Sequence, residues 1–119
     1  MYALLLRWNL AGKDPEMLDE LRQYIRDESW ERYRTVRHLA GKSWLSNPDP
    51  FEFAAFYLWE TVEARENEVR HMHHVNEITG VEPTIVRWDV EAMQVGQHEP
   101  IDFAVVGQAW STKVPTTPQ

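Results

Sequence analysis

Residues 46–60 of the chain, SNPDPFEFAAFYLWE, join a tight turn to a strand. The first five residues combine two prolines with serine, asparagine and aspartate, whose short side chains hydrogen-bond to their own backbone, and this composition is typical of turns. The ten residues that follow are mostly aromatic and apolar, which favours a strand. Because residues 37–45, RHLAGKSWL, form a second short strand candidate just before the turn, the whole segment predicts a β-hairpin.

Four other segments on either side of this hairpin have clear patterns. Before the hairpin, an apolar run at residues 2–10 is typical of a strand buried on both faces, and a helix runs from Asp14 to an end between Ser29 and Thr35. After the hairpin, a helix runs from Thr61 to about Thr79, where Gly80 stops it, and a strand occupies residues 84–90. The order is then strand, helix, strand, strand, helix, strand. It predicts an α+β ferredoxin-like fold, in which a four-stranded antiparallel sheet carries both helices on one face.

The length of 119 residues is that of one domain, and we expect this domain to occupy residues 1–95. Residues 96–119 then form a C-terminal extension. Within it the apolar run at residues 101–106, IDFAVV, is expected to form an extra strand that crosses to a partner subunit. The last residues, STKVPTTPQ, have the composition of a flexible tail.

Composition restricts the partners of the chain. The formal net charge is −7 and the basic residues are mixed with acidic ones, so nucleic acid is not an expected partner, because its binding depends on neutralising phosphates. Without cysteine the chain has no disulfides and no thiolate nucleophile. The first apolar run is too short for a membrane span or for the core of a signal peptide, so we expect a soluble, cytoplasmic protein with no membrane partner.

The predicted sheet leaves one face without helices. A sheet this rich in aromatic and aliphatic residues would expose a large apolar patch there, and a second copy of the chain is the simplest cover. We therefore expect a homodimer that packs through its sheet faces. Between two such sheets a closed cavity for a small molecule can form, lined by alternating strand positions.

Polar residues inside the strands are candidates for such a cavity. In the first strand Arg7 and Asn9 share one face, while the other face is wholly apolar or aromatic and suits the helices. Arg87 and Asp89 repeat the pattern in the last strand. Buried polar groups need partners, so these side chains either form a structural network of ion pairs or face a ligand.

Aromatic residues of the hairpin are further candidates. In its second strand, the face that carries the Tyr57 hydroxyl is the expected cavity side, and Trp59 shares that face. Trp44 lies in the strand before the turn. All three either line a pocket or belong to ordinary core or dimer packing.

These segments resemble the YdhR-type monooxygenases, a family of dimeric α/β barrels with ferredoxin-like subunits. The likeness lies in three motifs: GKSWL before the turn, FYLWE after it, and ITGVEPTIVRWDV at residues 78–90. Within the first two motifs, four residues stand at the family's positions, namely Lys42, Trp44, Tyr57 and Leu58. It covers roughly residues 3–91. The chain departs from the family in VRHLAG, where a Pro-Gly step usually stands, and in its extension.

The resemblance implies a homodimer with a pocket in each subunit and a reaction without metal, flavin or other cofactor. Relatives in this wider group help a phenolic or polyketide-like substrate to form a carbanion, which itself reacts with oxygen. Such a reaction needs a group that removes a proton or stabilises charge, together with a dry aromatic cavity.

Roles follow from chemistry and strand face. We expect Arg7 or Arg87 to stabilise an enolate or phenolate, Asn9 to orient the substrate or oxygen, and Tyr57 to donate a hydrogen bond. The predicted site comprises the catalytic residues Arg7, Asn9, Tyr57 and His73 and the substrate-binding residues Trp44, Trp59 and Arg87.

Three of the five histidines gather in RHMHHVNEITG, residues 70–80. On one continuous helix, His73 would face the sheet while His71 and His74 would lie on the solvent side. No carboxylate completes a set of ligands with the outer pair, so we expect no metal site. His73 either bonds a carbonyl near the helix end or reaches the pocket as a base.

Two other functions fit the same pattern. One is a polyketide cyclase or isomerase that uses the same pocket, with His73 or Tyr57 as acid or base. The other is a dimer that binds a small molecule without turnover. Oxygen consumption separates the oxygenase from both alternatives, and turnover without oxygen separates the isomerase from the binder.

Overall fold

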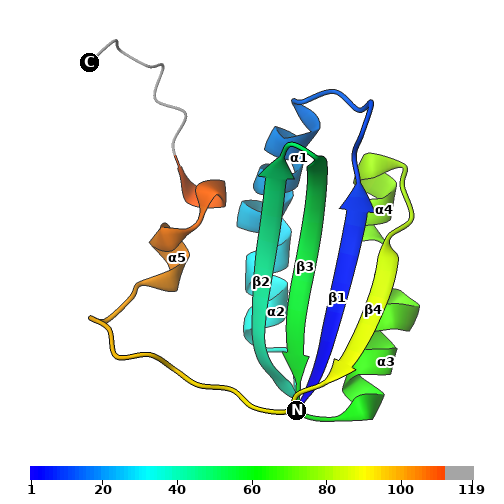
Figure 1. Cartoon of the computed structure of the whole chain (residues 1–119). Coiled ribbons are helices and arrows are strands. Elements are labelled where there is room, and N and C mark those ends of the chain that lie inside the picture. Colours follow the sequence, from blue (N-terminus) through cyan, green and yellow to red (C-terminus); the bar gives the residue numbers. More distant parts are fainter. Residues whose placement is uncertain (112–119) are drawn as a thin grey trace.

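The structure is a computed structural model that describes residues 1–111. Its four-stranded sheet has the order β2-β3-β1-β4, and each pair of neighbours is antiparallel (Figure 1). The strands are β1 (Tyr2–Asn9), β2 (Leu39–Pro48), β3 (Phe51–Trp59) and β4 (Thr84–Asp89). β2 and β3 form the hairpin that the turn predicts, and the predicted α+β fold with an antiparallel sheet is confirmed.

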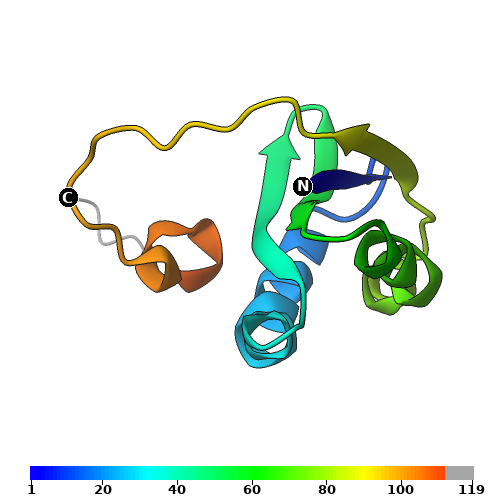
Figure 2. The same ribbon diagram turned by 90° about the horizontal axis from the view of Figure 1, so that it is seen from below.

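The helices of the folded domain cover one face of the sheet (Figure 2). The first helical segment consists of α1 (Met17–Tyr24), the π-helical turn η1 (Ile25–Ser29) and α2 (Trp30–Arg34). The second consists of α3 (Val62–His71) and α4 (His74–Thr79). Each strand therefore has one face against helices and one face without them, as the order of elements predicts.

The core lies between the sheet and these helices, and β1 is at its centre. Leu4 and Leu6 are fully buried on the helix side, and Trp8 is 2% exposed. The Trp8 indole N–H donates to Oδ1 of Asn76 at 2.6 Å, which ties α4 to the sheet. The apolar face of β1 thus faces the helices, as predicted.

The first helical segment ends at Arg34, within the predicted limits. Its middle is a π-turn, in which one extra residue widens the helix. The turn brings Ser29 to a fully buried position, where its Oγ accepts a hydrogen bond from the Trp44 indole at 3.1 Å. A helix of regular pitch would direct this short polar side chain elsewhere.

The second helical segment begins and ends where its sequence predicts, and it is capped at both ends. Thr61 precedes α3, and its Oγ1 accepts the backbone N–H of Ala64 at 3.1 Å. Gly80 follows α4 in the left-handed conformation, with φ of 70°. Glycine adopts this conformation without strain, so it stops the helix.

Between these caps the segment is broken, which corrects the prediction of one helix over residues 61–79. Met72 adopts an extended conformation (φ −77°, ψ 112°), so α3 ends at His71 and α4 begins at His74. Met72 packs against the hydrophobic core. Because the backbone changes direction there, helical spacing does not carry across the break, and it no longer decides which histidines face inward.

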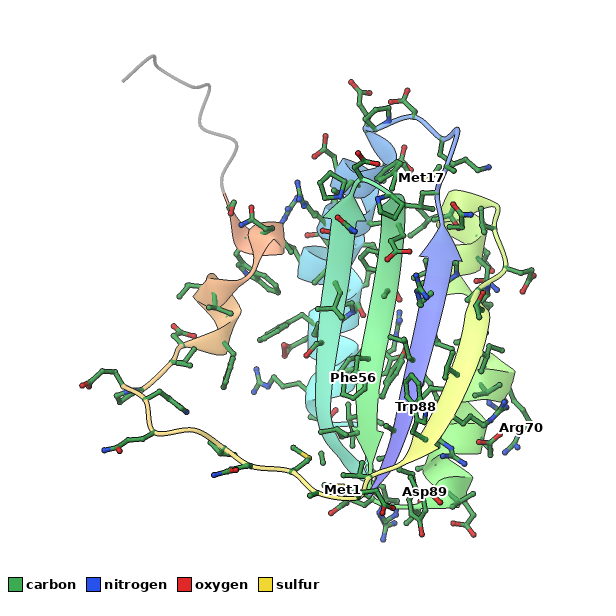
Figure 3. All side chains as sticks on the ribbon, viewed as in Figure 1. Met1, Met17, Phe56, Arg70, Trp88 and Asp89 are labelled. Atoms are coloured by element: carbon green, nitrogen blue, oxygen red, sulfur yellow. The ribbon has the colours of Figure 1, made fainter. Side chains whose placement is uncertain are left out.

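The face of the sheet without helices is called the open face below. Phe56 and Trp88 lie on it and point away from the helices (Figure 3). Trp88 is 52% exposed and Leu45 is 48% exposed. Leu5 and Val86 lie directly opposite each other between these positions. The open face is thus apolar along its centre.

The C-terminal extension does not contain the predicted extra strand. Residues 103–106 form the short helix α5 (Phe103–Val106), because the Asp102 carboxylate accepts the backbone N–H of Ala104 at 3.0 Å and caps a helical turn. Beyond β4 the chain runs past the edge of β2, away from the other strands (Figures 1 and 2). The predicted flexible tail falls largely on residues 112–119, which lie outside the described residues.

A second short helix of the extension, η2 (Gln108–Trp110), packs on the first helical segment. The Arg26 guanidinium donates to the carbonyl oxygen of Ala109 at 2.7 Å, and Ala109 is 8% exposed. The Trp110 ring meets the Trp30 ring edge-on, with centroids 4.7 Å apart. This part of the extension therefore belongs to the folded body. None of the helices within residues 1–111 is long and apolar enough to cross a membrane.

Candidate functional site

A cavity of about 20 Å³ lies between the helix-covered face of the sheet and the helices. That volume holds about one water molecule. Aromatic rings form most of its wall, and polar groups gather at one part of it. Its lining residues include Tyr33, Lys42, Trp44, Tyr57, Glu68, His73 and His74.

A buried carboxylate with two phenol partners forms the polar part of the cavity. Glu68, in α3, is 9% exposed. Its Oε2 accepts hydrogen bonds from the Tyr33 hydroxyl at 2.5 Å and from the Tyr57 hydroxyl at 2.9 Å. Burial is the main cause and the nearby Glu68 charge the second cause that raise the pKa of both tyrosines well above the ordinary value for tyrosine. Both phenols therefore stay protonated and act as hydrogen-bond donors.

The ammonium of Lys42 lies over three aromatic rings beside this carboxylate. Lys42 projects from β2, and its Nζ is 3.3 Å from the centroid of the Tyr33 ring, 4.6 Å from that of Tyr57 and 4.7 Å from that of Trp44. Burial lowers the pKa of Lys42 to about 7, although the Glu68 charge opposes this change. The amine therefore changes its protonation state near neutral pH.

Aromatic contacts link one wall of the cavity to the C-terminal extension. The Trp44 ring lies 5.6 Å from that of Trp30, centroid to centroid, and Trp30 in turn contacts Trp110. Trp44 also meets Tyr33 edge-on at 6.3 Å. The position of the Trp44 wall thus depends on three separate segments of the chain.

Two histidines line the cavity at the break between α3 and α4. His73 keeps 59% of its side chain exposed, and its Nδ1 lies 2.7 Å from the carbonyl oxygen of His71. His74 is less exposed; its ring stacks on Tyr24 at 5.8 Å and on His73 at 4.6 Å. Burial lowers the pKa of His74. The expected orientations of His73 and His74 are therefore exchanged, because the broken helix turns His74 inward and leaves His73 at the rim, while His71 is exposed as expected.

Arg7 and Asn9, two of the predicted catalytic residues, lie on the open face and so on the opposite side of the sheet from the cavity. Arg7 donates to the Glu52 carboxylate at 2.9 Å, and Asn9 accepts the backbone N–H of Ala11 at 2.9 Å. Arg7 and Glu52 line a shallow hollow of about 200 Å³ on that face. This hollow is larger than the cavity, but it is open and its charges are already paired.

The remaining predicted residues lie on the helix side but not all in the cavity. Arg87 is opposite Leu4 and forms an ion pair with Glu66 at 2.9 Å. This pair is the structural network considered above, with a helix carboxylate as partner, and the hydrogen bond from Arg87 lowers the pKa of Glu66. Trp59 stacks behind Tyr57 with centroids 5.7 Å apart. Its indole N–H is buried without a hydrogen-bond partner in the described residues.

The structure thus brings together Tyr57, Trp44 and His73 and separates them from the predicted arginines. Sequence reasoning missed Glu68 and Tyr33 as site residues. A signal for Lys42 was present, because it is the one charged residue in β2 and stands among apolar and small residues.

Comparison of the sequence with known protein families and with curated proteins found no match. Solved structures do share its fold. A candidate antibiotic biosynthesis monooxygenase from Deinococcus radiodurans is 14% identical, with a TM-score of 0.60 over 82% of this chain and 100% of that chain. A monooxygenase from the gene ActVA-Orf6 of Streptomyces coelicolor, in complex with Nanaomycin D, is 14% identical, with a TM-score of 0.60 over 81% of this chain and 92% of that chain.

SnoaB, a cofactor-independent oxygenase from Streptomyces nogalater, is 8% identical, with a TM-score of 0.52 over 77% of this chain and 94% of that chain. Another similar structure is that of a protein of unknown function. At these identities the likeness is one of fold. The chain therefore has a ferredoxin-like α+β fold, which these solved structures share.

Proposed function

We propose that the protein is a small monooxygenase-like enzyme that acts on an aromatic or polyketide-type molecule in the cavity between its sheet and helices, without a metal or an organic cofactor. The observation that carries the proposal is the joint placement of Glu68, Lys42 and two protonated tyrosines among aromatic rings. Rings bind a flat apolar substrate, and the polar cluster meets its oxygen atoms. The names of the monooxygenases with this fold support the same class of reaction.

The proposed reaction needs a substrate that supplies all its electrons. Removal of a proton from a hydroxy-aromatic substrate gives an anion that is electron-rich at carbon, and this carbon reacts with O₂. One oxygen atom becomes a new carbonyl oxygen, while the other leaves as water with the two hydrogens that the substrate loses. The protein then has to bind the substrate, exclude water and stabilise the anion.

In this proposal the residues of the cavity have distinct tasks. The Tyr57 hydroxyl donates to the substrate oxygen, and Trp44 stacks on its ring. His73 lies at the rim, where its exposed ring turns aside to admit the substrate, because the cavity of about 20 Å³ must widen to take it. The presence of Lys42, Trp44 and Tyr57 in one cavity also supports a YdhR-type enzyme, which we expect to be cytoplasmic.

We also propose a homodimer that forms through the open faces. Trp88 and Leu45 are about half exposed there, at the two edges of a strip that also includes Phe56. A patch of this kind on one sheet face is typical of an interface. Arg7 and Asn9 lie beside it, so we assign them to contacts with the partner subunit.

A cyclase or isomerase would use the same acid and base groups without oxygen. Lys42 and Tyr57 are the observation that favours it, since a titrating amine beside a protonated phenol supports proton shifts in general. Turnover of a polyketide-type substrate under argon would favour this second function, and dependence on O₂ favours the first.

Oxygen consumption tests the proposed function. Purified protein is mixed with anthrones, naphthols and hydroquinones, and oxygen uptake is followed with an electrode. Glu68→Gln should reduce the rate of oxygen uptake about 100-fold, because it removes the charge of the carboxylate that accepts hydrogen bonds from the two phenols. Glu63→Gln is the matched control, since it is the same change at an exposed position of the same helix. If wild-type protein consumes no oxygen with any member of the panel, the proposal fails.

A further inference from the structure

We infer that Lys42 is the general base of this site: its neutral amine removes the proton from the hydroxyl of a hydroxy-aromatic substrate. The inference rests on the proposed function, which it deepens by naming the base and the class of substrate. It takes the place of His73, for which the sequence left open the role of a base, and it leaves Tyr57 as the expected hydrogen-bond donor.

The surroundings of the Lys42 amine differ from those of an ordinary lysine. Its Nζ lies over the faces of Tyr33, Tyr57 and Trp44, at 3.3, 4.6 and 4.7 Å from their centroids. Among residues 1–111, no carboxylate oxygen forms an ion pair with it within 4.0 Å. The charged amine has therefore lost water without gaining a contact ion pair. Under these conditions the neutral form becomes accessible.

Several ionisable groups act on this amine from the elements packed around it. The Glu68 charge, from α3, favours the ammonium, while Arg32, from α2, disfavours it. The other ionisable residues that line the same cavity are Tyr24, Tyr33, Tyr57, His73 and His74. The balance, dominated by burial, holds the pKa of Lys42 at about 7. At pH 8 most of the amine is therefore neutral and able to accept a proton.

The alternative bases are less suitable. Tyr33 and Tyr57 both donate to Glu68, and their raised pKa values keep them protonated. His73 is 59% exposed and lies at the rim of the cavity, where it is open to solvent. Lys42 combines access to the cavity, a basic nitrogen and a flexible four-carbon stem that can follow the substrate.

The proton transfer is balanced within the cavity. The substrate O–H bond breaks, an N–H bond forms on Nζ, and the ammonium remains beside the new phenolate. No proton leaves for solvent, and the net charge of the cavity is unchanged. The ring faces and the Glu68 charge then stabilise the ammonium. Each unit by which the substrate pKa exceeds that of the amine costs a factor of ten, and the attraction between the new ammonium and phenolate offsets about three such units. Phenols and naphthols are therefore within reach, but aliphatic alcohols are not.

Counting protons during binding tests this transfer. The probe is 2-naphthol, whose anion and neutral form have different absorption spectra, and proton release is followed with an indicator dye in weak buffer. Wild-type protein should bind naphtholate without proton release at pH 8. At pH 6, where the amine is already protonated, it should release about one proton for each naphtholate bound. The number of protons released per naphtholate bound should fall from one to zero with a midpoint near pH 7.

Two substitutions of Lys42 distinguish a base from a fixed charge. Lys42→Arg keeps a positive charge that cannot accept a proton, so any naphtholate it binds should release one proton at both pH values. Lys42→Met should bind only neutral naphthol, and if this variant does not fold, the arginine variant still decides the test. Lys13→Arg is the matched control at an exposed lysine and should match wild type. Both Lys42 variants should lose oxygen uptake at pH 8 by about 100-fold or more.

The outcomes separate this inference from the proposed function. It is overturned if wild-type protein binds no naphthol, binds only the neutral form at pH 8, or releases a proton there for each naphtholate bound. Oxygen uptake that persists in both Lys42 variants also overturns it, while the oxygenase proposal stands. If the proton count follows the prediction but no substrate consumes oxygen, Lys42 is supported as a base and the oxygenase proposal fails.

Discussion

The buried amine of Lys42 should make the stability of the protein rise with pH between about 7 and 10.5. In the unfolded chain the amine has its ordinary pKa of 10.5, and in the folded chain the pKa is about 7. Between these values the unfolded state binds one more proton than the folded state, so the free energy of unfolding rises with pH. This stabilisation is fully present above pH 10.5 and is lost as the pH falls toward 7.

The size of the effect follows from the number of protons. One proton corresponds to about 1.4 kcal/mol per pH unit, so wild-type protein should gain about 2 kcal/mol between pH 7.5 and 9.0. That is a large part of the total stability of a small domain, about 5–15 kcal/mol. The measurement stays below pH 9.5, because the raised pKa values of Tyr33 and Tyr57 have the opposite effect above pH 10.

Urea unfolding followed by tryptophan fluorescence is a suitable assay, since the chain has six tryptophans. Lys42→Met should remove the rise between pH 7.5 and 9.0, and Lys13→Met, a change at an exposed lysine, should retain it. Equal pH dependence in wild type and Lys42→Met would refute the reasoning, because the rise would then come from other groups.

Three further predictions concern the fold and the proposed dimer. Leu6→Ala should lower the free energy of unfolding by about 2–5 kcal/mol in urea titrations, since Leu6 is fully buried; a loss below 1 kcal/mol would contradict the core described. Thr61→Ala should cost about 1 kcal/mol by removing the cap on Ala64, whereas Thr61→Ser should cost much less, and equal losses would argue against the cap. Trp88→Glu should convert a dimer to a monomer in analytical ultracentrifugation, because Trp88 is 52% exposed on the open face, and an unchanged sedimentation coefficient would exclude that face as the interface.

The order of strands and helices could be predicted from the sequence because each signal is local. The SNPDP turn, the helix start at Thr61 and the helix stop at Gly80 all depend on a few neighbouring residues. The faces of β1 could also be predicted, since its apolar positions alternate with Arg7 and Asn9. What such patterns do not contain is how the faces of different strands match.

Which side chains of two neighbouring strands share a face of the sheet depends on the register in which the strands pair. Both faces of β3 are apolar, so its composition does not reveal which one meets the helices. Only the pairing of Leu4 with both Tyr57 and Arg87 shows that these two residues share the helix side. The same register places Arg7 on the opposite side, which is why the predicted residues do not converge.

The histidines show a second limit of local reasoning. No proline or glycine stands at Met72 to announce that the helix breaks there. Packing of Met72 into the core accompanies the break, and such tertiary contacts are not visible in a helical projection. Tyr33 and Glu68 were missed for a similar reason, because their contact joins helical segments 35 residues apart.

The π-turn in the first helical segment makes the spacing of the cavity walls sensitive to the length of the chain. A deletion of one residue within Ile25–Ser29 would restore a regular helix, and on local grounds it would look harmless. It would also rotate everything before the turn by about 100° relative to everything after it. Trp30 and Tyr33 could then not face Trp44 and Glu68 while Leu21 stays in the core. An insertion or deletion at this point therefore marks a relative with a different cavity, even where every lining residue is the same.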